Sequence, residues 1–113
     1  MSIPRKSLAS TKFGNVDTGK RLRAVHPGTV LLDDFIGPLG LTRYRVAKAI
    51  GVPQRRVDEI CLGSRAVTAD TALRLGRFFS VDPQFWMSLQ AQYDLEVAES
   101  ALDTEIIPLQ PAA

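Results

Sequence analysis

Residues 43–62, with the sequence RYRVAKAIGVPQRRVDEICL, constrain the fold of this chain more than any other stretch. Their apolar side chains recur at helical spacing in two groups, which lie on either side of a glycine and a proline. The first group is Val46, Ala47 and Ile50, and the second is Val57 and Ile60. The spacing predicts two short helices that pack through small, buried faces.

Glycine and proline mark the break between these two helices. Gly51 stands where the first helix must end, because helices commonly end in a left-handed residue and glycine adopts that conformation freely. Pro53 follows two residues later, and proline can open a helix but cannot continue one. We therefore predict a helix-turn-helix in which residues 53–62 form the second helix, the one that is presented to DNA.

The outward face of the second helix is polar and charged. Gln and Arg side chains carry the donors and acceptors that read base edges in the major groove. We predict base-reading roles for Gln54, Arg55, Arg56, Asp58 and Glu59. For the two arginines the alternative is an exposed charged surface. Each acid either reads cytosine, holds an arginine in place or is merely solvated.

Capping residues and apolar spacing predict a helix on the N-terminal side of this motif. Thr29 follows a Pro-Gly pair and is the expected N-cap of that helix, and Thr42 is the expected N-cap of residues 43–50. The buried stripe expected for the first helix follows the spacing i, i+3, i+4, i+7 and consists of Leu32, Phe35, Ile36 and Leu39.

Two further helices are predicted on the C-terminal side. Thr68 is the expected N-cap of the fourth, and the pair Asp82-Pro83 begins a fifth that runs to about residue 100. The fifth has more aromatic surface than a small core needs, so part of it is expected to be a dimer face. The residues expected there are Phe85, Leu89, Tyr93 and Val97, whereas Trp86 is expected to close the core.

Charge is unevenly distributed along the chain. Residues 1–24 hold six Lys or Arg and one acid, whereas residues 79–113 hold six acids and no Lys or Arg. We predict a basic, flexible arm over residues 1–25, a helix-turn-helix domain over residues 26–101 and a tail over residues 102–113. The arm either contacts phosphate or a partner or is a disordered leader. Solubility is the alternative explanation for the charge of both ends.

Several classes of protein are disfavoured by the composition. The single cysteine, Cys61, excludes an internal disulfide and fits a cytoplasmic location. No apolar run approaches the roughly 18 residues of a membrane span, and no secretory signal is visible. His26 is the only histidine and has no ligand-type neighbour, so no metal or cofactor is expected. A ribonuclease needs convergent acid and base groups, which are missing, so we predict that the chain is not an enzyme.

Three segments together give the chain a family resemblance. They are HPGTVL at 26–31, GPLGLTRYRVAKAIGVPQRRVDEICLGSRAVTADTALRL at 37–75 and FFSVDPQFWMSLQAQYDLEVA at 78–98. On these motifs the chain resembles the Xre-type helix-turn-helix family, which has the Cro and phage-repressor fold. More narrowly, it resembles the HigA-type antitoxins of bacterial toxin–antitoxin operons. The first 24 residues are longer than the leader typical of that family, so no role is transferred to them.

The resemblance implies an all-α, five-helix domain that forms a homodimer through its C-terminal helix region. It implies binding to double-stranded operator DNA ahead of its own operon and silencing of a HigB-type mRNA endonuclease toxin. Gln54 and Arg55 then match the base-reading start of the second helix. Matching positions for backbone phosphate contacts, with the neighbours Thr42 and Ser64 added, are Thr42, Arg43, Tyr44, Ser64, Arg65 and Thr68. The alternative function is a stand-alone Xre-type transcriptional repressor without a cognate toxin.

Overall fold

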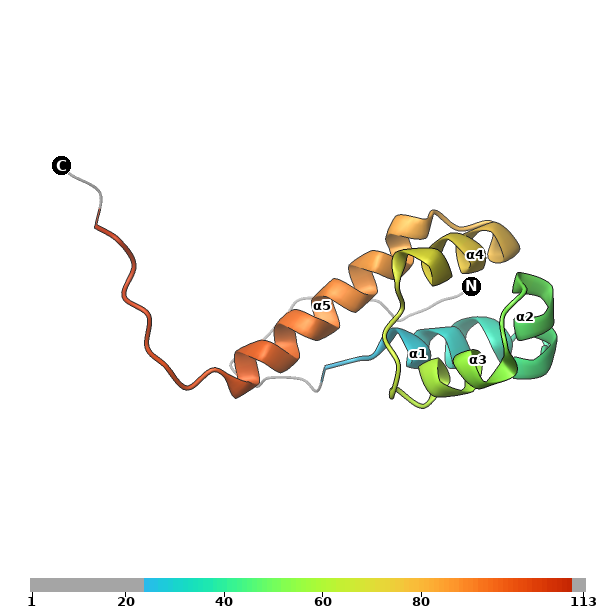
Figure 1. The fold of residues 1–113 in the computed structure, drawn as a ribbon, viewed down its shortest axis with the longest axis horizontal. Coiled ribbons are helices and arrows are strands. Elements are labelled where there is room, and N and C mark those ends of the chain that lie inside the picture. Colours follow the sequence, from blue (N-terminus) through green and yellow to red (C-terminus); the bar gives the residue numbers. More distant parts are fainter. Residues whose placement is uncertain (1–23, 111–113) are drawn as a thin grey trace.

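Short polar residues, glycine and proline divide residues 24–110, the part described by this computed structural model, into a succession of helices (Figure 1). The helix α1 (Pro27–Val30) continues into a π-helical segment, η1 (Leu31–Ile36). The helices α2 (Arg43–Ile50), α3 (Gln54–Cys61), α4 (Ala69–Phe79) and α5 (Pro83–Ala101) follow. The predicted all-α fold is confirmed, and no helix of this described part is long and apolar enough to cross a membrane.

The predicted N-caps are confirmed at α2, α4 and α5. The Thr42 hydroxyl accepts a hydrogen bond from the Arg45 amide at 3.0 Å, and the Thr68 hydroxyl accepts one from the Thr71 amide at 3.4 Å. Asp82 accepts one from the Gln84 amide at 2.8 Å. Each bond satisfies an amide that the first turn of a helix leaves without a partner. Capping residues in the sequence therefore predict these three helix starts correctly.

The expected cap of the first helix is wrong. That helix begins at Pro27, and Nδ1 of His26 accepts the hydrogen bond from the Gly28 amide at 2.9 Å. The imidazole nitrogen thus does what a Ser or Asp oxygen usually does, and Thr29 lies exposed inside the helix.

The predicted buried stripe of the first helix is half wrong. Leu32 and Leu39 are 37% and 61% exposed, whereas Leu31 and Ile36 are 0% and 3% exposed. The cause is the π-helical segment, in which the Gly37 amide donates to the Leu32 carbonyl at 2.9 Å. Because the bonded partners are then five positions apart in sequence, Leu31 and Ile36 share the buried face, and a periodicity of 3.6 residues per turn predicts the wrong set.

The turn between α2 and α3 forms as predicted, with a small shift at its end. Gly51 ends α2 with a φ of +76°, in the left-handed region. Pro53 has an extended backbone and is the N-cap of α3, so that helix begins at Gln54 rather than at the proline. Gly63 follows α3 with a φ of +82°, again in the left-handed region.

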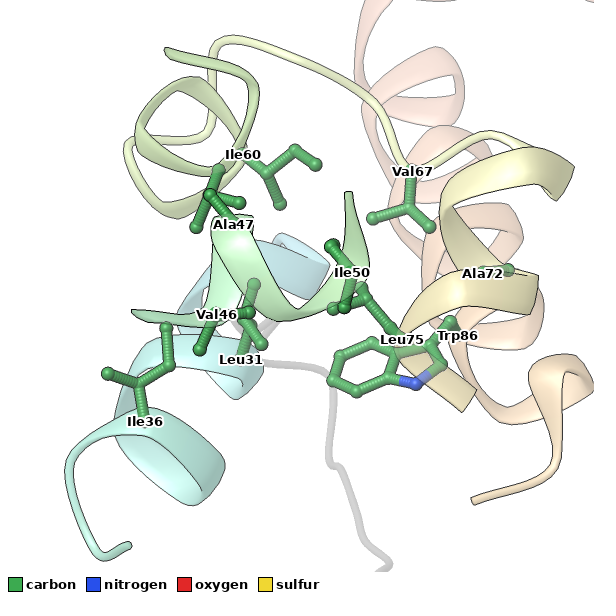
Figure 2. Packing of buried hydrophobic residues seen from close by; sticks show 11 residues of the cluster. Leu31, Ile36, Val46, Ala47, Ile50, Ile60, Val67, Ala72, Leu75 and Trp86 are labelled. Carbon is green, nitrogen blue, oxygen red and sulfur yellow. The ribbon is translucent and has the colours of Figure 1, made fainter. Parts of the chain in front are cut away.

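The core joins the helix-turn-helix to α4 and α5 (Figure 2). All five apolar residues predicted for the motif are buried, as is Trp86, which is 0% exposed and closes the core from α5. Gly28 allows α1 to lie directly on α3: a Cβ atom there would be 1.7 Å from the Ile60 carbonyl oxygen. The first helix therefore fixes the position of α3 through backbone contact.

The end of the chain extends away from this core. In Figure 1, α5 runs past the other helices and leads into residues 102–110, which are non-helical and exposed. Leu95 and Val97, on the second half of α5, are 67% and 46% exposed. The predicted arm, residues 1–25, lies almost entirely outside the described residues.

Candidate nucleic-acid interface

The start of α3 presents polar side chains to solvent, while its other face holds it in the domain. Val57 and Ile60 are each 1% exposed and anchor the helix. Gln54 and Arg55 lie on the exposed side, and the Arg55 side chain is 84% exposed. Reading bases in the major groove requires an exposed helix that carries hydrogen-bond donors. The predicted base-reading start of α3 meets this requirement.

Glu59 joins two arginines of this surface. Its Oε2 atom accepts from Nε of Arg55 at 3.0 Å, and its Oε1 atom accepts from Nε of Arg65 at 2.8 Å. The hydrogen bonds from Arg65 and then Arg55 lower the pKa of the Glu59 carboxyl, so the group stays ionised. Residues predicted for base and for phosphate contacts are thus brought together, although Arg65 belongs to the loop after α3.

The other charged residues of α3 also have partners within the chain. Oδ1 of Asp58 is buried and lies 3.4 Å from Nε of Arg43, an ion-pair distance without a hydrogen bond. Nη1 of Arg56 lies 3.1 Å from the Asp70 carboxylate on α4, and the Arg56 side chain is only 31% exposed. Arg56 is therefore directed towards α4, unlike Arg55.

The remaining residues predicted for phosphate contacts lie at helix starts and in one loop. Thr42 and Thr68 cap α2 and α4, whose first-turn amides favour a nearby anion. The Ser64 hydroxyl donates to the Glu59 carbonyl at 3.2 Å. Tyr44 is 57% exposed, and Nζ of Lys48 lies 5.8 Å from the centre of its ring.

A buried glutamine that the sequence reasoning missed fixes the loop between α3 and α4. Gln90, on α5, is 6% exposed, and its Oε1 atom accepts from the Val67 amide at 2.7 Å. Its Nε2 atom donates to Asp94 at 2.9 Å. One signal was present in the sequence: Gln90 lies four residues after Trp86, on the face of α5 that enters the core.

Arg74 on α4 is a second structural contact that was not predicted. Its Nη1 atom donates to the Ile50 carbonyl at 2.7 Å, at the end of α2, and its Nε atom donates to Asp70 at 3.0 Å. A cation at the C-terminus of a helix satisfies a free carbonyl and complements the helix dipole. Asp70 thereby holds both Arg74 and Arg56.

His26 joins the first helix to the loop and to α5. Burial lowers the pKa of its imidazole, against the opposing effects of Asp94 and of the Arg65 backbone. Its ring lies edge-on to Tyr93 at 4.8 Å. Tyr93, predicted for a dimer interface, thus packs within its own chain.

The other residues predicted for the dimer interface differ in exposure. Leu89 is half-buried against the core, whereas Phe85 and Val97 are 38% and 46% exposed. The Phe85 ring also packs on Trp86, with 5.0 Å between ring centres. Among residues 24–110, no three His, Cys, Asp or Glu side chains are grouped so as to hold a metal ion.

Comparison with known proteins decides the family. Residues 36–86 match the family described as Helix-turn-helix. The solved structure of the Pseudomonas aeruginosa antitoxin HigA with the higBA promoter is 38% identical, with a TM-score of 0.75 over 78% of this chain and 100% of that one. This chain belongs to the helix-turn-helix family that includes the HigA antitoxins.

Two curated relatives are similar to this chain over a longer stretch than the α2–α3 motif. Virulence-associated protein I of Dichelobacter nodosus is 41% identical over 102 residues, which are 88% of this chain and 94% of that protein. Antitoxin HigA-1 of Vibrio cholerae is 33% identical over 73 residues, which are 65% of this chain and 69% of that protein. The family relationship therefore extends beyond the α2–α3 motif.

Proposed function

We propose that this protein is a sequence-specific DNA-binding antitoxin that represses its own operon and neutralises a HigB-type mRNA endonuclease toxin. The observation that carries the DNA-binding part is the exposed start of α3, with Arg55 at 84% exposure. The HigA structure with its promoter supports the same assignment, since that structure contains DNA and this chain covers all of its protein.

We propose that Gln54 and Arg55 read base edges. Arg55 offers a bidentate pair of donors to guanine and Gln54 an amide to adenine, contacts worth roughly 1–3 kcal/mol of discrimination each. The base contacts of Arg56, Asp58 and Glu59 stay predictions, and each of these side chains has an ion-pair partner within the chain.

Backbone phosphates are proposed to bind around this helix start. The proposed contacts come from the starts of α2 and α4 and from the loop after α3, and they carry affinity without sequence information. They are Thr42, Arg43, Tyr44, Ser64, Arg65 and Thr68.

A homodimer is proposed to bind a palindromic operator, with its two α3 helices roughly 34 Å apart, one turn of DNA. The proposed interface is the face of α5 that carries Phe85, Leu89, Tyr93 and Val97. Exposed apolar residues on this face, Phe85 at 38% and Val97 at 46%, support it because a second copy would remove them from water.

The toxin partner rests on the family relationship. If a small basic ribonuclease-like protein is encoded beside this gene, we expect the two proteins to copurify and the toxin's RNA cleavage to be suppressed. If no such gene is present, the alternative of a stand-alone repressor applies. The chain itself is proposed to have no catalytic activity, and RNA cleavage by the purified protein would contradict that.

Two single variants test the DNA-binding roles. Arg55→Ala should weaken binding to DNA from upstream of the gene by roughly 1–3 kcal/mol and binding to scrambled DNA much less. Arg65→Ala should weaken both and reduce the slope of log affinity against log salt by about 1. Fluorescence anisotropy at several salt concentrations measures both. Equal losses on the two DNAs for Arg55→Ala would exclude a base-reading role.

A further inference from the structure

We propose that Glu59 is a positioning residue that sets the base preference of this surface by holding Arg55 and Arg65 in one arrangement. The inference rests on the proposed function, in which Arg55 reads a base. Of the alternatives that the sequence leaves open for Glu59, it selects the holding of an arginine over direct base reading. The role is to restrict the arginine that makes the contact.

The geometry leaves the reading end of Arg55 available. Glu59 binds Arg55 through Nε alone, at 3.0 Å. Within residues 24–110 neither Nη group of Arg55 donates a hydrogen bond. A bidentate contact to guanine needs two such donors at fixed spacing, so the carboxylate holds the stem of the guanidinium while its terminal donors face outward.

The same carboxylate fixes the phosphate-binding side of the surface. Arg65 binds Oε1 of Glu59 through Nε and Nη2, at 2.8 Å in each case. The Glu59 carbonyl also accepts from the Ser64 amide at 2.9 Å and from the Ser64 hydroxyl at 3.2 Å. Backbone and side chain of one residue therefore set where the loop residues stand relative to Arg55.

Direct cytosine reading by Glu59 fits the structure less well. A carboxylate that reads cytosine accepts from the base N4 amino group. Both Glu59 oxygens already accept from arginine, and the side chain is 28% exposed whereas Arg55 is 84% exposed. Arg55 stands further out, so it is the group that meets the base and Glu59 is the group behind it.

A positioning role and a purely structural role of Glu59 predict effects of opposite sign on the affinity for random DNA. Glu59 carries a negative charge close to proposed phosphate contacts, so its neutralisation should raise affinity for any DNA. It should also release Arg55 from its fixed orientation, which lowers the preference for the operator. A residue needed only for folding would instead weaken binding to both DNAs.

Glu59→Gln in the full chain is the test, with Asp34→Asn as the control for the loss of one negative charge. Both variants remove one negative charge, and Asp34 is exposed on η1 and is not among the residues predicted to contact DNA. Affinities for the DNA upstream of the gene and for scrambled DNA are measured at one salt concentration, and thermal unfolding verifies the fold. We expect Glu59→Gln to lower the ratio of the two affinities about tenfold and Asp34→Asn to change it by less than about twofold.

A double variant separates this inference from the proposed function. When Arg55 is already alanine, Glu59→Gln should cause no further loss of preference for the upstream DNA, because the guanidinium that Glu59 positions is absent. If Arg55→Ala alone leaves the preference unchanged, the proposed base contact itself is wrong. If Arg55→Ala lowers the preference but Glu59→Gln does not, or if Asp34→Asn lowers it equally, only the positioning role is overturned.

Discussion

Gly28→Ala tests how the first helix holds α3 in place. The substitution adds one methyl group at a point where the two backbones meet. A Cβ atom at Gly28 would lie 1.7 Å from the Ile60 carbonyl oxygen and 2.6 Å from its carbonyl carbon. These are backbone atoms of α3, so no side chain can rotate away, and α1 must separate from α3.

The expected loss in the free energy of unfolding is large because no side-chain movement can relieve a clash with backbone atoms. Overpacked cores lose about 1–3 kcal/mol, and a contact against rigid backbone belongs at or above the upper end, at about 3 kcal/mol. Without the clash, alanine would stabilise a helix relative to glycine by about 1 kcal/mol. A loss of stability in Gly28→Ala therefore indicates the clash, and a gain indicates its absence. For a domain of this size a loss of about 3 kcal/mol lowers Tm by roughly 12–24 °C.

Urea unfolding followed by far-UV circular dichroism measures the free energy of unfolding, with Thr29→Ala as the control. Thr29 is the next residue of the same helix and is exposed, so its change to alanine should be neutral within about 0.5 kcal/mol. If Gly28→Ala is as stable as the wild type or more so, the close backbone approach of α1 and α3 is wrong.

Three other substitutions follow from the contacts around the loop and α4. His26 has a lowered pKa, so the unfolded chain binds a proton first and stability should fall as pH drops below the ordinary value of 6.5; urea unfolding across that range should show the fall, and His26→Gln should abolish that part of it. Gln90→Leu should cost about 1–3 kcal/mol because the Val67 amide loses its acceptor, and an unchanged urea midpoint would contradict the contact. Arg74→Ala should cost about 1 kcal/mol, since the end of α2 loses a donor at a partly exposed site, and calorimetric unfolding against Arg77→Ala, also on α4, tests it.

The helix-turn-helix was predictable because its signals are local. Gly51, the Thr42 cap and the apolar spacing of α2 and α3 all act within a few residues of where they stand. For the first helix, the predicted N-cap and part of the predicted buried stripe are wrong because two of its features are unusual. A histidine is its N-cap, and a π-helical segment places Leu31 rather than Leu32 in the core.

The candidate surface was predicted as a set of residues but not as an arrangement. Helix position alone indicated that Arg55 is exposed. The link from Glu59 to Arg65 depends on how the loop after α3 folds back, and Gln90 reaches Val67 from a helix 23 residues away in sequence. Contacts of this kind are set by tertiary packing, which spacing in the sequence does not encode.

Titration of the full-length protein with DNA from upstream of its own gene, beside scrambled DNA of equal length and at two salt concentrations, tests the central claim most directly. We expect a preference of about a thousandfold or more for the upstream DNA, because base contacts from α3 add to phosphate contacts common to both. Equal affinity for the two DNAs, falling equally steeply with salt, would contradict sequence-specific recognition by α3.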